Sequence, residues 1–146
     1  LAALDPAAGE ARAAGDAALG GEIAIDRARA LVALDRAAEA QAPLAEARAA
    51  LPGNAQAWLL SATLSRRLGK LADAQAQIER AAELLPIDPA IGLEAGVIAV
   101  LSGREEAARK SWTSVIAAAP ESEAATTARG YLAQLGAPPA QEGKTP

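Results

Sequence analysis

Two pairs of acidic residues are the groups whose type and spacing could support acid–base chemistry, namely Glu105 with Glu106 and Glu121 with Glu123. Paired carboxylates act as general acid and base when a cleft shifts their pKa values apart. Both pairs fall near predicted helix starts, where acidic side chains interact favourably with the helix dipole. Nothing in the sequence places them in a cleft, and we therefore interpret them as surface residues.

Residue types that the chain lacks exclude most other chemistry. The sequence contains no Cys and no His, so disulfides, the usual zinc ligand sets and Ser-His or Cys-His catalytic pairs are excluded. Gly20-Gly21 lacks the lysine of a phosphate-binding loop, and the acidic spacing does not fit a calcium loop. The formal net charge of −4 argues against nucleic acid as a partner. We expect no enzymatic activity, no cofactor and no metal, and we expect Trp58 and Trp112 to pack between helices rather than stack on bases.

The composition predicts an all-α chain of one domain. Of the 146 residues, 51% are hydrophobic, but 43 are alanine and only three are aromatic. Alanine, Leu, Glu, Arg and Gln favour helices, whereas strand-forming residues are sparse. Because alanine contributes little buried area, such a chain forms a core only where helices approach closely. Small residues should therefore recur at fixed positions.

A period of 34 residues supplies those positions. Pro52, Pro86 and Pro120 are separated by this interval. Shifting the sequence by 34 residues aligns N-cap residues, turn residues, small residues and large residues in columns. These columns are Asn54/Asp88/Ser122, Asp35/Gly69/Gly103, Ala28/Ala62/Gly96, Ala40/Ala74/Ala108, Leu44/Ile78/Trp112 and Ala47/Ala81/Val115. The pattern predicts stacked helical hairpins.

Each repeat unit is predicted to be a helix, a tight turn, a second helix and a short proline loop. Pro43 lies inside the second helix of the first unit and should bend or break it. The helices are expected near residues 22–34, 37–50, 55–68, 71–84, 89–101 and 104–118.

The two ends of the chain depart from the period. Residues 1–20 should form an N-terminal helix or degenerate repeat, helical over about 6–19, ended by Gly20-Gly21 and packed on the first hairpin. A helix over 123–135, within the segment 123–136, should cover the last hairpin with Ala124, Ala128, Tyr131, Leu132 and Leu135 as its inner side. Residues 137–146 should be a disordered tail.

This pattern resembles the tetratricopeptide repeat (TPR) family over residues 21–122. Trp58 matches the early aromatic of the family's first helix, and the small-residue columns and closing prolines match as well. Departures occur where the family carries a tyrosine, since Leu31, Ser65 and Ala99 stand there. The resemblance implies a right-handed α-α superhelix of three hairpins, with repeats at 21–54, 55–88 and 89–122.

The resemblance also implies protein binding in a concave groove lined by the first helix of each repeat. Carried over by position, the partner-binding residues are Ile25, Arg29, Val32, Leu59, Thr63, Arg66, Arg67, Leu93, Val97 and Val100. The family's chaperone-tail mode needs lysines and asparagines, and Ile25, Leu59, Leu93, Thr63 and Val97 replace them here. The resemblance therefore favours an apolar groove for a peptide or helix with apolar anchors, as in a scaffold or adaptor.

Two alternatives remain open at this point. The apolar face of the groove could be covered by the chain itself or by a second copy. Cover by a second copy would make the protein a homodimeric structural module. Alternatively, the protein could be a helper domain of a bacterial envelope assembly protein. The chain begins at Leu1, and we expect a targeting region to lie outside it, which leaves cytoplasm and periplasm open. No apolar run is long enough for a membrane span.

Overall fold

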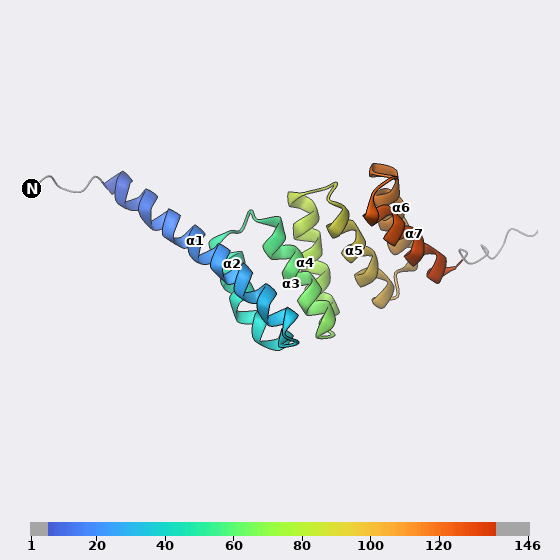
Figure 1. Ribbon diagram of the computed structural model, residues 1–146, viewed down its shortest axis with the longest axis horizontal. Helices are drawn as coiled ribbons and strands as arrows, with labels where there is room; N and C mark the ends of the chain where they lie inside the picture. The colour runs from blue at the N-terminus through green and yellow to red at the C-terminus, as the bar shows by residue number, and fades with distance from the viewer. Residues whose placement is uncertain (1–5, 137–146) are drawn as a thin grey trace, which may run out of the picture. The chain divides into compact units, whose positions relative to one another are not determined.

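The computed structural model describes the backbone of residues 6–136 and the side chains of residues 13–136 (Figure 1). The predicted tail at 137–146 and the first five residues lie outside the described residues. The chain divides into two compact units, Leu1–Leu85 and Pro86–Pro146, called unit 1 and unit 2 below. In the described part, every regular element is a helix, as predicted from the composition.

Unit 1 consists of two helical hairpins. The first pairs α1 (Pro6–Ala33) with a 3-10 turn, η1 (Ala37–Ala40), and with α2 (Gln41–Ala50). The second pairs α3 (Ala55–Arg67) with α4 (Leu71–Leu84). Unit 2 contains α5 (Pro89–Leu101), α6 (Glu105–Ala118) and α7 (Glu123–Leu135), with α6 packed against both of its neighbours. The predicted helices of the second and third repeats are confirmed to within one residue at each end.

The predicted helix end at Gly20-Gly21 is wrong, because α1 continues through both glycines to Ala33. Gly21 is buried, and a Cβ built on it would come within 2.8 Å of the Leu51 side chain. The glycine therefore permits close approach between α1 and the residue that ends α2. This packing offsets the cost of about 1 kcal/mol in helix stability that glycine carries relative to alanine.

Over residues 13–20, the predicted packing of the N-terminal helix on the first hairpin is also wrong. Of residues 13–20, all except Ala18 are exposed, and Leu19 is 60% exposed. Figure 1 shows this part of α1 extending beyond α2. The sequence supplies it with alanines and few large apolar side chains, so it has little surface with which to pack on the hairpin.

Pro43 divides the second helix of the first repeat, as predicted. The segment begins as η1 and becomes α-helical at Gln41, which places Pro43 in the first turn of α2. A proline there loses no hydrogen bond, since the first-turn amides have no partner within the helix. Pro43 is itself buried, so it contributes to packing as well.

The capping and turn columns are confirmed. The side chains of Asn54, Asp88 and Ser122 each accept a hydrogen bond from a backbone amide in the first turn of α3, α5 and α7. Asp35, Gly69 and Gly103 all have positive φ, of 59°, 75° and 76°. These left-handed residues reverse the chain between the two helices of each hairpin.

The small-residue columns form the core. Each predicted small position is buried, and each larger side chain in the paired columns is buried as well. The members are Ala28, Ala40, Leu44 and Ala47 in the first repeat, Ala62, Ala74, Ile78 and Ala81 in the second, and Gly96, Ala108, Trp112 and Val115 in the third.

Trp112 organises the core of unit 2. Its side chain is 4% exposed, and its Nε1–H donates to the Leu93 carbonyl at 3.2 Å. Its ring centroid lies 5.1 Å from that of Tyr131 on α7, with the planes tilted by 45°. A Cβ on Gly96 would overlap the indole. The predicted cover of the last hairpin by α7 is therefore confirmed, since the predicted inner residues of α7 pack in this cluster or beside it.

Candidate functional site

An apolar pocket opens on unit 2 between α5, α6 and α7. Its volume is about 250 Å³, and apolar side chains dominate its lining. Leu101 is 53% exposed at this pocket, whereas Trp112 is buried. The lining residues are Val97, Val100, Leu101, Trp112, Tyr131, Gln134 and Leu135. Such a pocket can accept an apolar side chain and offers the amide of Gln134 as a hydrogen-bonding group.

The three predicted partner-binding residues of α5 lie at or beside this pocket. Val97 and Val100 line it, and both also pack against the Trp112 cluster. Leu93 is partly buried against the same cluster and does not line the pocket. Two of the predicted residues of α5 therefore line the pocket together with Tyr131 and Leu135, which α7 contributes. Those two residues had been expected only to cover the last hairpin.

The seven predicted residues of unit 1 differ in their surroundings. Ile25 is 2% exposed and belongs to a core cluster with Ala24, Ala47 and Ala57, so it offers no surface to a partner. Val32 packs beside a second core cluster. Arg29 forms an ion pair with Asp26, with 3.5 Å between Nη1 and Oδ1. Arg67 is exposed. The other three residues, Leu59, Thr63 and Arg66, are partly buried.

The ten predicted partner-binding residues are thus divided between unit 1 and unit 2. A continuous groove through all three first helices therefore stays a prediction.

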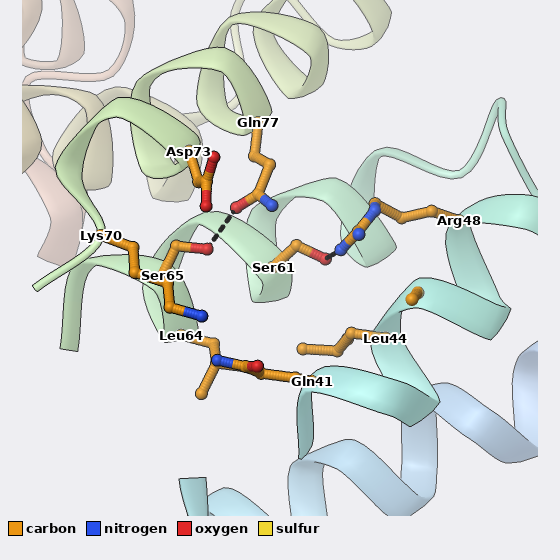
Figure 2. A pocket seen from close by; sticks show the side chains of 10 residues that line it. Gln41, Leu44, Arg48, Ser61, Leu64, Ser65, Lys70, Asp73 and Gln77 are labelled. Atoms are coloured by element: carbon orange, nitrogen blue, oxygen red, sulfur yellow. Dashed lines mark hydrogen bonds between the residues drawn. The ribbon is translucent and has the colours of Figure 1, made fainter. Parts of the chain in front are cut away.

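A second pocket, which the sequence did not indicate, lies in unit 1 between α2, α3 and α4 (Figure 2). Its volume is about 220 Å³. Arg48 Nη1 donates to Ser61 Oγ at 2.6 Å, and the Ser61 hydroxyl donates to the Ala57 carbonyl at 2.8 Å. Opposite them, the Ser65 hydroxyl donates to Gln77 Oε1 at 2.7 Å. The lining residues are Gln41, Leu44, Ala45, Arg48, Ser61, Leu64, Ser65, Lys70, Asp73 and Gln77.

Arg48 is partly buried in this polar pocket. Burial lowers the pKa of its guanidinium from the usual value, and the charge of Asp73 acts in the opposite direction. The guanidinium carbon also lies 5.6 Å from the centre of the Trp58 ring. Trp58 in turn donates from Nε1 to the Pro52 carbonyl at 2.9 Å. Trp58, the early aromatic residue of the repeat, therefore contacts both the proline loop, through a hydrogen bond, and Arg48, through its ring.

The acidic pairs do not form a site. Glu105 and Glu106 lie exposed in the first turn of α6, and their carboxylates are 3.8 and 3.6 Å from the Arg109 guanidinium. Glu121 and Glu123 are exposed at the start of α7. Among the described residues, no group of three His, Cys, Asp or Glu side chains could hold a metal. None of the described helices is long and apolar enough to cross a membrane.

Comparison with solved structures identifies the class of fold. The TPR domain of Arabidopsis OM64 superposes with a TM-score of 0.73 and 16% sequence identity, over 82% of this chain and 98% of that domain. No family model matches the sequence. No curated protein matches it either. The chain therefore has a TPR-like all-helical fold, as the repeat period predicted.

Proposed function

We propose that this protein is a non-catalytic interaction module that binds a peptide or helix of a partner protein through the apolar pocket of unit 2. The observation that carries the proposal is the partial exposure of this pocket. Leu101 is 53% exposed beside Val97 and Val100, on a helix whose sequence is apolar apart from Glu94. A helix apolar all round is ordinarily buried, so the open side of α5 favours a partner.

The pocket suits one anchoring apolar side chain of the partner. Burial of a leucine or phenylalanine side chain contributes about 1.5–3 kcal/mol. An amphipathic helix presents such anchors at intervals of three and four residues, which fits a shallow site between helices. Tyr131 and Gln134 supply hydrogen-bonding groups at the pocket and would favour one orientation of the bound segment.

The exposed and partly buried first-helix residues of unit 1 are proposed as secondary contacts. Arg29, Arg66 and Arg67 would attract an acidic segment, and Leu59 and Thr63 would contact its apolar or small residues. Charges of this kind act mainly on the association rate, and added salt screens them. Their contribution should therefore fall as ionic strength rises, whereas the contribution of the α5–α7 pocket should persist.

The test begins with selection of peptides from a randomised display library against the purified protein. Affinities of the selected peptides are then measured by fluorescence polarisation for the wild type, for Leu101→Glu and for Leu34→Glu. Both leucines are exposed, at 53% and 66%, but only Leu101 lines the pocket. We expect Leu101→Glu to weaken binding and Leu34→Glu to leave it unchanged. Equal affinities for all three proteins would reject the pocket as the binding site.

Self-association is a second candidate function, favoured by the unpacked part of α1. Leu19 and Ile23 are 60% and 59% exposed, and their spacing of four residues places them on one side of the helix. Two copies could bury these side chains against each other. Sedimentation velocity over a concentration series should then show a dimer that Leu19→Glu abolishes. A monomer at all concentrations would reject this candidate.

A further inference from the structure

The polar pocket of unit 1 contains a cation, Arg48, that makes few contacts with other polar groups among the described residues. Arg48 carries five N–H donors. Among the described residues, its guanidinium makes one hydrogen bond, from Nη1 to Ser61 Oγ. Within the described part of the chain, no carboxylate forms an ion pair with Arg48; Asp73 affects it only at longer range. A partly buried charge without a close counter-ion is unfavourable, and a bound anion would relieve this cost.

The pocket holds the guanidinium in one orientation. Ser61 is 1% exposed, and its hydroxyl is fixed by the Ala57 carbonyl, so it accepts from Arg48 in a defined direction. The guanidinium carbon also lies over the Trp58 ring, 5.6 Å from its centre. Figure 2 shows Arg48 extending from α2 toward Ser61 on α3, with Gln77 and Asp73 on α4 across the pocket. A guanidinium held in this way is prepared to bind a planar anion.

The charges around the pocket favour a monoanion. Arg48 and Lys70 are cationic and Asp73 is anionic, which leaves one net positive charge among the lining residues. A carboxylate neutralises that charge, whereas a phosphate dianion would leave one net negative charge in the pocket. Gln41 supplies a further amide donor. The Gln77 amide can also donate, because its oxygen already accepts from Ser65.

We propose that the unit 1 pocket binds a carboxylate group, held by the Arg48 guanidinium, which contacts Ser61 and lies over Trp58. This site is separate from the apolar pocket of unit 2 and does not depend on it. The carboxylate can belong to a small organic acid, to the end of a peptide or to an acidic side chain. These sources share one chemistry, and the arms of the experiment distinguish them.

The two tryptophans provide the readout, because the sequence has only Trp58 and Trp112 and they lie in different units. Their indole N–H resonances, assigned with Trp58→Phe, are followed by ¹H–¹⁵N NMR during titration of the full chain. The probes are acetate, an acetylated tripeptide with a free C-terminus, and an amidated tripeptide with a central glutamate. The matched peptide without any carboxylate is the control. We expect a saturable shift of the Trp58 resonance while that of Trp112 stays in place.

Three variants test the assignment to this pocket. Arg48→Gln should weaken binding about tenfold, the loss expected for one charge-assisted hydrogen bond. Asp73→Asn should strengthen it, because the substitution raises the net positive charge of the pocket. Arg80→Gln removes one positive charge, as Arg48→Gln does, but from a residue of α4 outside the pocket lining. It should leave carboxylate binding unchanged. An unchanged circular dichroism spectrum and a dispersed Trp58 indole resonance in the absence of ligand confirm that unit 1 of each variant is folded.

Several results would overturn the proposal. These are the absence of a Trp58 shift with every carboxylate, equal shifts of both indoles, or equal binding by the peptide without a carboxylate. Tighter binding of inorganic phosphate than of the carboxylates would also overturn it. Binding in only one arm identifies the source of the carboxylate and supports the site.

Discussion

Gly96→Ala is expected to destabilise unit 2, although alanine ordinarily stabilises a helix. A Cβ at Gly96 overlaps Nε1 and Cε2 of Trp112, so the indole must move. The ring has little freedom to do so, because it is buried, donates to the Leu93 carbonyl and packs on Tyr131. Overpacking of this kind costs about 1–3 kcal/mol. Loss of the Trp112 hydrogen bond adds about 1 kcal/mol.

The helix-propensity gain of about 1 kcal/mol for alanine over glycine opposes these losses. We therefore expect the free energy of unfolding to fall by about 2 kcal/mol, measured by urea denaturation with circular dichroism. The matched control is Gly130→Ala in α7, where the added Cβ would meet no described atom within 4 Å beyond its chain neighbours and its own helix backbone. That substitution should raise the free energy of unfolding by about 0.5–1 kcal/mol.

The repeat columns provide a test with a change of sign. The first and second repeats place alanine opposite leucine and isoleucine, at Ala28 with Leu44 and at Ala62 with Ile78, whereas the third places Gly96 against Trp112. In a Trp112→Ile background, Gly96→Ala should therefore become stabilising, because the methyl group fills space that the indole has left. Destabilisation by Gly96→Ala in both backgrounds, or in neither, would refute the packing argument.

Three further predictions concern the turns, the caps and pH. Asp35→Gly should stabilise the protein and Gly69→Ala should destabilise it, each by about 1 kcal/mol in thermal or urea unfolding, because both residues have positive φ. Asn54→Ala should cost about 1 kcal/mol, since the Asn54 side chain accepts from two backbone amides of α3; Asn54→Ser should retain most of the stability. Arg36 donates to the Glu39 carboxylate and holds the pKa of that carboxyl below its usual value. This pair therefore favours the folded state above the ordinary carboxyl pKa, and its contribution is lost as pH falls through the lowered pKa. A ¹³C NMR titration should find the pKa of Glu39 lowered in the wild type and ordinary in Arg36→Gln.

The sequence predicted the elements whose causes are local and repeated. Asn54, Asp88 and Ser122 start helices because their side chains bond the amides that follow, whatever the rest of the chain does. Gly69 and Gly103 end helices because glycine adopts positive φ without strain. The period of 34 residues then aligned equivalent small and large residues of the three repeats, and this alignment predicted which positions form the core.

What the sequence did not predict depends on contacts between distant segments. Gly20-Gly21 is locally typical of a helix end, yet α1 continues through it, and Gly21 packs closely against Leu51. Ile25 was assigned to a binding face by position, but α2 and α3 bury it.

The polar pocket was missed for the same reason. Arg48, Ser61 and Gln77 come from three helices, and no spacing in the sequence signals that they meet. The only signal was that two serines, Ser61 and Ser65, fall one turn apart at buried positions.

The most direct test of the proposed interaction function is site-specific photo-crosslinking at the unit 2 pocket. A photo-reactive amino acid replaces Leu101 in one protein and the exposed Thr113 of α6, outside the pocket lining, in another. Each protein is irradiated in an extract of the organism that encodes it, with and without an excess of a display-selected peptide. We predict discrete adducts at position 101 that the peptide suppresses, and none at position 113. Identical adducts at both positions, or adducts at 101 that the peptide leaves unchanged, would contradict binding at this pocket.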